Sequence, residues 1–347
     1  MSDHSSVDDL FDSQEERPPR PRRKKKVWRK ILVALLVIVI LGVLGVGLYL
    51  WNVGRTFDNN ANKLTDEQVF GKQSPGGKED GGTNILLLGS DEPMDQVDVN
   101  DSRGLRSDTI MVMHIPESGS NVQVMSIPRD SWVDIEGHGK AKINSALSTG
   151  GLPLAVSTIS DFIGTELDHV AIIDFEGFKA LTDSLGGVTV NSEQSFEKNG
   201  YTFEKGENLL DGDEALTFVR ERKSFQDGDF QRARNQQAFI RGLTNEIISA
   251  DTLSNPKKIQ DMVKNFSPYM YVDSGLDAQY ISATAFAMRD VRPGDIEFFT
   301  SPTAGAGTSS DGQSIVNVDE EELKKVQDAY KNDTLDDYVK NAPESHL

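Results

Sequence analysis

Short apolar runs alternate along the chain with segments of helical hydrophobic periodicity. The apolar runs have the length of buried strands and lie at residues 84–89, 110–115, 122–127, 170–173, 188–190 and 295–300. In the other segments apolar residues recur every three or four positions, which predicts helices at residues 153–162, 175–185, 230–249, 256–265, 277–288 and 319–331. Strands and helices that alternate in this order predict an α/β layer fold, with helices on the faces of a sheet.

Glycine-rich segments separate several of these elements. The Gly pair at residues 186–187 is expected to end the preceding helix, as glycines after a helix C-terminus do. Residues 206–212 are expected to form a turn and residues 305–312 a loop. Residues 213–219 are expected to form either a short helix or an extended approach to the arginines that follow.

An uncharged apolar span of twenty residues lies near the N-terminus, at residues 31–50. At a rise of about 1.5 Å per residue such a helix measures about 30 Å, which is the hydrocarbon thickness of a bilayer. Trp28 and Trp51 flank the span, and residues 17–30 hold nine cations and no anion. Because positive flanks stay in the cytoplasm, the sequence predicts a single-pass protein of the cell membrane, with its N-terminus cytoplasmic and the rest of the chain after the span extracytoplasmic.

The apolar span is expected to stay in the mature protein. A cleaved signal peptide has a shorter apolar region that ends in small residues, whereas residues 50–53 read Leu-Trp-Asn-Val. The chain is therefore expected to comprise a disordered basic cytoplasmic tail (1–30), a transmembrane signal anchor (31–51), an extracytoplasmic linker (52–83), one folded domain (84–335) and a frayed C-terminus (336–347).

Composition and charge exclude several classes of protein. The chain has no Cys, so disulfides, thiolate metal sites and Cys nucleophiles are excluded, and its five His include no HExxH pair. The net charge is −19, and residues 31–347 hold 27 cations against 49 anions. An acidic domain of this kind repels the phosphate backbone, so no nucleic-acid partner is expected.

Two strands predicted in the first half of the folded domain end in charged residues. Arg106 and Asp108 precede the run at 110–115, Arg129 follows the run at 122–127, and Lys142 comes soon after. Charges at the edge of a sheet lie where loops hold chemistry on a rigid base, and this set suits an anionic ligand. The alternative is that they form ordinary surface ion pairs, which contribute little to stability.

A second group of cations follows later in the chain. Arg220 and Arg222 are two residues apart, so on extended backbone they would point the same way. Arg232 and Gln236 are four apart and would share one face of a helix. Guanidinium groups bind phosphate oxygens two at a time, so together these residues would hold a pyrophosphate. The alternative is again surface arginines paired with the many acids of the domain.

Two carboxylates complete a candidate phosphoryl-transfer site. Asp91 and Asp108 lie at predicted strand ends and could together hold a hard divalent ion, which prefers carboxylate oxygens and bridges to phosphates. Arginines, a divalent ion and a pyrophosphate are the usual parts of such a site, in which positioning and charge neutralisation supply most of the catalysis.

Seven short motifs, taken in order, resemble the LytR-CpsA-Psr family. They occupy residues 107–111, 126–130, 142–144, 174–178, 185–188, 210–222 and 228–237. The resemblance covers about residues 84–250, and the N-terminal anchor matches as well.

The resemblance implies a single α/β/α sandwich domain with a mixed central sheet. It implies a phosphotransferase that moves a phospho-glycopolymer, whether teichoic acid, capsule or another polymer, from undecaprenyl pyrophosphate to peptidoglycan. It further implies that Asp91 and Asp108 bind Mg²⁺, with Mn²⁺ as the alternative ion. The residues implied to face the pyrophosphate are Arg106, Arg129, Lys142, Arg220, Arg222, Arg232 and Gln236. Asp229 stands where the family suggests an acidic catalytic role, alongside Arg129 and Arg220.

The chain departs from the family pattern at two positions. Glu92 follows Asp91 where the family usually has Arg, and Asn235 stands where an Arg often precedes the paired Gln residues. These departures put contacts to the lipid head group and the substrate preference in doubt. A polyprenyl tail also requires an apolar tunnel, which is expected between the sheet and the helices, lined by parts of residues 154–181 and 239–247.

Two other functions remain as alternatives at this point. A polyprenyl-pyrophosphate hydrolase would use the same residues and would need no glycan acceptor. A regulatory envelope protein would bind the lipid without chemistry. A DNA-binding regulator is disfavoured, because only the short basic tail would face the cytoplasm and topology already accounts for its charge.

Overall fold

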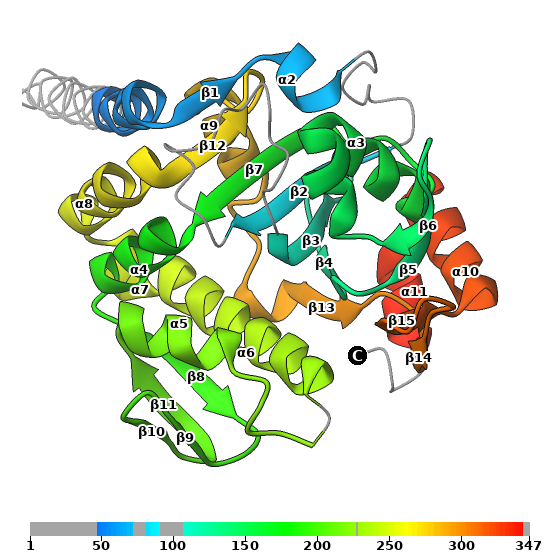
Figure 1. Ribbon diagram of the computed structural model, residues 1–347. Coiled ribbons are helices and arrows are strands. Elements are labelled where there is room, and N and C mark those ends of the chain that lie inside the picture. Colours follow the sequence, from blue (N-terminus) through cyan, green and yellow to red (C-terminus); the bar gives the residue numbers. More distant parts are fainter. Residues whose placement is uncertain (1–46, 72–80, 91–106, 227, 343–347) are drawn as a thin grey trace, which may run out of the picture. The chain divides into compact units, whose positions relative to one another are not determined.

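The computed structural model describes residues 47–71, 81–90, 107–226 and 228–342, and the described residues from Leu50 onward form one compact unit (Figure 1). Most of the predicted membrane span therefore lies outside the described residues. Within the described ranges, no helix has both the length and the apolar character needed to cross a bilayer.

A mixed sheet of seven strands forms the centre of this unit (Figure 1). In spatial order the strands are β1 (Asn62–Leu64), β12 (Met270–Asp273), β7 (His169–Asp174), β2 (Thr83–Ser90), β3 (Ser107–Ile115), β4 (Val122–Ile127) and β13 (Ile296–Thr300). β2 is parallel to β7 and antiparallel to β3, while β4 is antiparallel to β3 and parallel to β13. The predicted α/β fold with a mixed central sheet is thus confirmed.

The register brings several strand ends to one edge of the sheet. Ser90 pairs with Asp174 on one side and with Ser107 on the other. Ile110 pairs with Ile127, so the loop after β4 starts at the same edge. This edge therefore collects the carboxyl ends of β2, β4 and β7 together with the beginning of β3, which are the strand ends that the charged motifs flank.

One face of the sheet is covered by helices that build the largest core. These helices are α2 (Asp66–Phe70), α3 (Ser145–Ile163), α10 (Glu320–Lys331) and α11 (Leu335–Asn341). Leu86 and Val112 point to this side and pack with Ile159 of α3. Because side chains alternate along a strand, their neighbours Leu87 and Met111 point to the opposite face.

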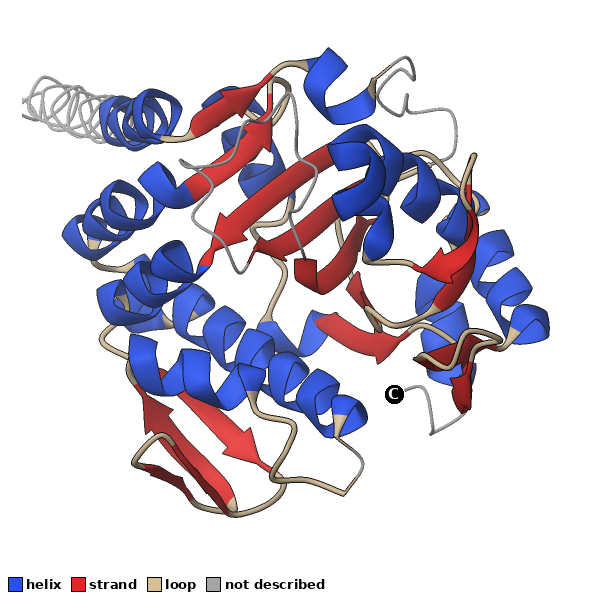
Figure 2. Ribbon diagram, viewed as in Figure 1, coloured by secondary structure: helices blue, strands red, loops and turns tan. Residues whose placement is uncertain are grey.

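The opposite face of the sheet lies against a second group of elements (Figure 2). These are α4 (Phe175–Ser184), α5 (Gly212–Arg220), α6 (Asp229–Ile248), α7 (Ala250–Leu253), α8 (Pro256–Phe266) and α9 (Ala278–Ala287). Ile240 of α6 contacts both the sheet core and a second core, which also contains Phe218 and Phe239. Helices thus lie on both faces of the sheet, as the sequence pattern predicts.

Small two-stranded sheets complete the unit. They are β5 (Trp132–Ile135) with β6 (Gly139–Lys142), β8 (Val188–Ser192) with β11 (Gly206–Leu210), β9 (Phe196–Lys198) with β10 (Tyr201–Phe203), and β14 (Thr303–Thr308) with β15 (Ser314–Val318). The expected turn at 206–212 was therefore wrong over most of its length, because β8 completes the hydrogen bonds of residues 206–210, which local composition does not reveal. The expected loop at 305–312 was wrong only in its first half: residues 305–308 belong to β14, and residues 309–312 lie in the turn between β14 and β15.

Both boundaries of the predicted folded domain also need correction. Residues 50–60 are helical, β1 pairs with β12, and Phe70 of α2 is buried, so much of the expected linker at 52–83 belongs to the folded unit. At the other end, α11 extends to Asn341 and buries Val339, so the fold continues past residue 335. The three residues of β1 carry no apolar run, and only their long-range pairing makes them part of the sheet.

Candidate active site

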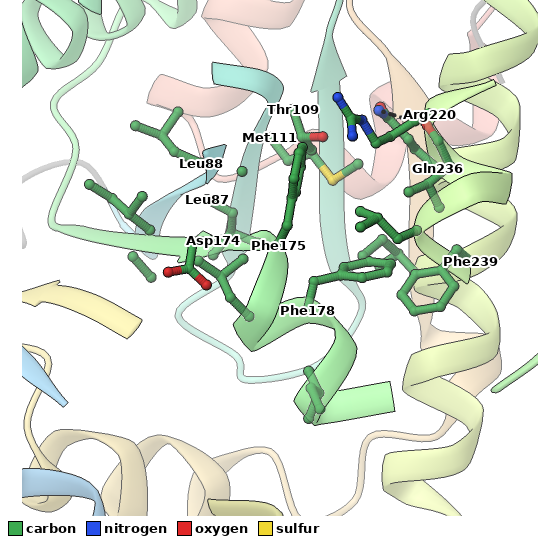
Figure 3. Close-up of a pocket in the computed structure, with 18 of the residues that line it drawn as sticks. Leu87, Leu88, Thr109, Met111, Asp174, Phe175, Phe178, Arg220, Gln236 and Phe239 are labelled. Carbon is green, nitrogen blue, oxygen red and sulfur yellow. Dashed lines mark hydrogen bonds between the residues drawn. The ribbon is translucent and has the colours of Figure 1, made fainter. Parts of the chain in front are cut away.

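A cavity of about 370 Å³ lies between the sheet and the helices α4, α5 and α6 (Figure 3). Most of its wall is apolar. The apolar side chains come from β2, β3, β7 and β12 and from four helices, and they include Leu87, Met111, Ile173, Phe178, Leu181, Leu216, Val219, Phe239, Ile240, Phe266 and Met270. A largely apolar wall of this kind suits a hydrocarbon chain.

The polar part of the wall consists mainly of cations. The side chains that contribute are Arg129, Arg220, Arg222, Arg232 and Gln236, with Thr109 and Asp174 nearby. Figure 3 shows Arg220 and Gln236 close together, and the amide of Gln236 donates to the Val219 carbonyl at 3.4 Å. Four arginines that are separated by up to 103 residues in the sequence thus line one largely apolar cavity.

Arg220 is held at the cavity by an aromatic ring. It is the last residue of α5, and its Cζ lies 4.3 Å from the centroid of the Phe175 ring. The extended backbone expected at Arg220 was wrong, because Asp211 and Glu214 form a capping box that starts a helix and carries it to this residue. Arg222 nevertheless also reaches the cavity, from the extended segment after the helix.

Glu221, between the two arginines, is turned into the protein. Its side chain is 3% exposed, and its carboxylate accepts from Lys198 Nζ at 2.7 Å and from the Ser224 N–H at 2.8 Å. Burial opposes the charge of Glu221, but these two donors outweigh burial and lower the pKa of its carboxyl. This anchor fixes the backbone between Arg220 and Arg222.

We call Arg129, Arg220, Arg222, Arg232 and Gln236 together the arginine mouth of the cavity. Helix α6 supplies the last two of these residues from one of its faces. Arg232 is 7% exposed, and Gln236 follows one turn later, as the spacing of four predicts. Asn235 points elsewhere: it is buried, donates to the Phe218 carbonyl at 3.3 Å and accepts from Gln231 at 3.0 Å. At this departure from the family pattern, the side chain therefore ties α6 to α5.

Lys142 lies beside the site without lining the cavity. Its Nζ is 3.0 Å from an Asp130 carboxylate oxygen, and the Arg129 Nε is 3.9 Å from the other oxygen of the same group. The structure therefore places Lys142 next to Arg129 through Asp130, and it does not bring its ammonium to the cavity wall with the arginines.

The remaining predicted site residues cannot be placed as side chains. Asp91 and Arg106 lie outside the described residues, and only the backbone is described for Asp108 and Asp229. Residue 91 directly follows Ser90 and residue 108 directly follows Ser107, and Ser90 and Ser107 are register partners. Among the described side chains, no group of three or more His, Asp and Glu residues is arranged to hold a metal ion.

Asp174 is a cavity residue that the sequence prediction missed. It ends β7 opposite Ser90, is 6% exposed, and its Oδ1 accepts from the Gly177 N–H at 2.8 Å. Carboxylate oxygens are the donors that Mg²⁺ prefers, and among the described side chains Asp174 is the one carboxylate that lines the cavity. The motif at 174–178 contained both Asp174 and Phe175, and the position of the motif at a strand end was the signal that could have identified them.

The predicted tunnel is only partly where the sequence placed it. Residues 171–175, Phe178, Leu181, Phe239 and Ile240 line the cavity, but residues 154–163 of α3 pack on the opposite face of the sheet. Periodicity shows that a helix has an apolar side, and it does not show which face of the sheet that side covers.

Comparison with known proteins decides the family. The sequence profile of the LytR_cpsA_psr family matches residues 49–332. The chain belongs to the LytR-CpsA-Psr family. The resemblance found in the sequence motifs is therefore confirmed, and it extends beyond residues 84–250 in both directions.

Curated relatives of this LytR-CpsA-Psr protein are named for cell-wall assembly. The polyisoprenyl-teichoic acid–peptidoglycan teichoic acid transferase TagU of Enterococcus faecalis is 30% identical over 313 residues, covering 89% of this chain and 97% of the relative. TagU of Bacillus licheniformis is 34% identical over 251 residues, covering 70% and 76%. The cell wall biosynthesis protein LcpA of Corynebacterium glutamicum is 30% identical, with 84% and 63% covered.

Solved structures show the same fold. The crystal structure of Bacillus subtilis TagV has a TM-score of 0.63 at 24% identity and covers 74% of this chain and 98% of its own. That of Bacillus subtilis TagU has a TM-score of 0.52 at 26% identity and covers 75% and 97%. The arrangement of sheet and helices that forms the cavity is therefore that of the family.

Proposed function

We propose that this LytR-CpsA-Psr protein is a membrane-anchored phosphotransferase that moves a phospho-glycopolymer from undecaprenyl pyrophosphate to peptidoglycan. One observation supports this most: a largely apolar cavity is lined by four arginines from three segments of the chain. A polyprenyl pyrophosphate has the same two parts, a long hydrocarbon joined to a doubly charged head group. The names of the teichoic acid transferases related to the chain support the same reaction.

The apolar part of the cavity accounts for recognition of the carrier lipid. Burying hydrocarbon against side chains such as Phe178, Leu181 and Phe239 stabilises the complex by about 25 cal/mol per Å² of apolar surface. The predicted anchor would hold the protein in the bilayer that contains the carrier, which raises the effective concentration of one for the other.

The arginines account for binding and activation of the pyrophosphate. In the proposed reaction, an acceptor hydroxyl oxygen attacks the phosphorus that carries the glycan, and the bond from that phosphorus to the bridging oxygen breaks. Polyprenyl phosphate leaves with the electron pair. Arg129, Arg220 and Arg232 approach the cavity from three different elements and would neutralise charge on the phosphate oxygens as this bond breaks.

Two further roles complete the proposed mechanism. The acceptor hydroxyl must lose its proton, and Asp229, the first residue of α6, is the proposed base because Arg232 follows it by three residues on the same helix. Asp91 and Asp108 would hold Mg²⁺, or Mn²⁺, which adds positive charge at the phosphate oxygens when bound.

The test is transfer by the purified full-length protein. The donor is a polyprenyl pyrophosphate that carries a glycan, the acceptor is a peptidoglycan fragment, and mass spectrometry detects the phosphodiester product. Arg220→Ala and Arg222→Ala should each reduce product formation at least about a hundredfold, since one charged contact to a transition state is worth about 3 kcal/mol. Lys257→Ala, which changes an exposed lysine on α8, is the matched control and should form product at the wild-type rate. Loss of activity in this variant would mean that the protein preparation itself has failed.

Three outcomes would contradict the proposal. Unchanged turnover in both arginine variants would mean that the converging cations do not act on the substrate. Equal release of lipid phosphate with and without the acceptor would identify a hydrolase. Tight binding without any product, with either Mg²⁺ or Mn²⁺ present, would identify a lipid-binding protein that performs no chemistry.

A further inference from the structure

A second cavity lies beside the arginine mouth. It has a volume of about 550 Å³ and is formed by the β9–β10 hairpin, the outer side of α5 and the segment that follows α5. Its lining residues are Lys198, Asn199, Tyr201, Asp213, Leu216, Thr217, Arg220, Glu221, Arg222 and Lys223. We call this cavity the hairpin groove.

The hairpin groove continues from the cavity that holds the proposed lipid site. Leu216, Arg220 and Arg222 line both spaces. A molecule whose pyrophosphate contacts Arg220 and Arg222 can therefore extend directly into the groove. The first cavity is largely apolar and the hairpin groove is largely polar, so the two spaces suit opposite ends of one amphiphilic substrate.

The charge of the groove is positive, although the chain as a whole is strongly acidic. Four cations line it against two acids, Asp213 and Glu221. Glu221 is buried and bonded to Lys198, whereas Asp213 is exposed and lies 3.5 Å from Lys179. Arg222 and Lys223 are both exposed to solvent at the groove. Three cations, Arg220, Arg222 and Lys223, therefore act on a ligand in the groove against the single exposed acid Asp213, so the field stays positive.

The hairpin forms a firm wall for a ligand. Asn199 and Gly200 at its tip have φ angles of 53° and 87°, as a tight two-residue hairpin turn requires. Behind it the rings of Phe196 and Phe203 stack at 4.5 Å between centroids. Tyr201, which is half-buried, contributes to the groove an aromatic side chain with an apolar ring and a hydroxyl, the combination that packs against a sugar and also hydrogen-bonds to it.

From these features we propose that the hairpin groove binds the donor glycan beyond its pyrophosphate, and that it selects glycans bearing phosphate or carboxylate groups. This inference rests on the proposed function, because only a donor held at the arginine mouth places its glycan here. The donor is favoured over the acceptor because the groove shares Arg220 and Arg222 with the mouth, so a chain bonded to the pyrophosphate enters it without a gap.

The experiment measures dissociation constants of the full-length protein for three probes. The first is a polyprenyl pyrophosphate without a glycan, the second carries a neutral disaccharide, and the third carries the same disaccharide extended by glycerol phosphate units. Wild-type protein should bind the third probe at least about fivefold more tightly than the second at low salt, which corresponds to about 1 kcal/mol. Added salt should reduce this difference, because exposed charges are screened.

Charge reversal at Lys223 tests the hairpin groove independently of the arginine mouth. Lys223→Glu should abolish the preference for the third probe over the second, and Lys223→Gln should reduce it by about half, since it removes the charge without reversing it. Lys257→Glu is the matched control: this lysine is 87% exposed on α8 and lines neither cavity. It should leave the preference intact.

The results distinguish failure of this inference from failure of the proposed function. If the first probe binds but the second and third bind equally, or if Lys223→Glu and Lys257→Glu change the preference equally, the groove does not recognise anionic glycan and the proposed function still stands. If wild-type protein does not bind even the first probe, the proposed function is wrong and the inference falls with it.

Discussion

The guanidinium group of Arg220 lies over the ring of Phe175, with 4.3 Å between Cζ and the ring centroid. Phe175 is the first residue of α4, directly after the buried Asp174 at the end of β7, so the ring is fixed to the edge of the central sheet. Arg220 stands at the end of α5. A cation–π contact thus joins two helices at the place where the proposed pyrophosphate site begins.

Replacing Phe175 with Leu is expected to lower kcat/KM about twofold to fivefold. The change keeps an apolar side chain but removes the ring face, and a contact of this kind at a partly exposed site is worth about 0.5–1 kcal/mol, with more when water is excluded. Steady-state transfer assays check this. Melting temperature should change little, because the contact positions Arg220 and contributes little to the core.

A second contact of the same type provides a control for Phe175→Leu. Arg289 lies over Phe286 at 4.8 Å, and Phe286 is 70% exposed and lines neither the active-site cavity nor the hairpin groove. Phe286→Leu should leave transfer at the wild-type rate. Equal losses in both variants would mean that the Phe175 ring has no specific role in placing Arg220.

The ion pair of Glu221 with Lys198 is expected to make stability depend on pH in a defined range. The pKa of Glu221 is lowered in the folded protein, so the unfolded chain binds the proton more readily. The pair therefore contributes its full stability above the ordinary Glu pKa of about 4.3, and this contribution is lost as pH falls through the lower folded value. Thermal unfolding of wild type and Glu221→Gln between pH 3 and pH 7 measures it.

At pH 7, Glu221→Gln should have a lower melting temperature than wild type. The difference in melting temperature between the two proteins should become smaller toward pH 3. Lys198 is 36% exposed, so solvent screens the pair and the loss at pH 7 is expected to be about 1–2 kcal/mol, below the 3–5 kcal/mol of a fully buried pair. Glu176→Gln is the control, because it changes a 59% exposed carboxylate that pairs with Lys179 on the surface of α4. A constant difference between Glu221→Gln and wild type at all pH values would show that the charge of Glu221 is not the cause.

The sequence could indicate the cations of the site because two local patterns, helical spacing and position after an apolar run, pointed to them. A spacing of four residues placed Arg232 and Gln236 on one face of α6, and the position of Arg129 after an apolar run placed it at a strand end. The structure places Arg129, Arg220 and Arg232 on the wall of one cavity, although the backbone assumed at Arg220 was wrong. The helical signal was present in Asp211 and Glu214, whose capping box starts α5.

The missed features depend on contacts between distant segments. β1 joins the sheet only because Asn62–Leu64 pairs with Tyr271 to Asp273, and α3 covers one face of the sheet only because Leu86 and Val112 point that way. Neither relationship can be recognised from the hydrophobic periodicity of its own segment. The tie between Asn235 and Phe218 is of the same kind, since a buried amide between two helices reads in the sequence as one polar residue.

The affinity of the protein for a polyprenyl pyrophosphate is expected to depend on how much of the lipid fits into the apolar cavity. In a series of polyprenyl pyrophosphates, affinity should rise with each isoprene unit that enters the cavity, at about 0.8 kcal/mol per buried CH₂ group, and should level off when further units extend beyond it. Met270→Trp tests whether this cavity is responsible. Met270 lines the wall at the start of β12, and the larger ring would occupy part of the 370 Å³.

Met270→Trp should therefore shift the plateau to shorter chains while inorganic pyrophosphate binds as in wild type. Overpacking can also destabilise a protein by about 1–3 kcal/mol, so the variant's melting temperature must be measured alongside its binding. Met288→Trp is the matched control, because Met288 is a half-buried methionine that packs on the sheet core and does not line the cavity. An unchanged chain-length profile in a folded Met270→Trp protein would show that the lipid binds elsewhere, because a tail inside this cavity cannot avoid the added ring.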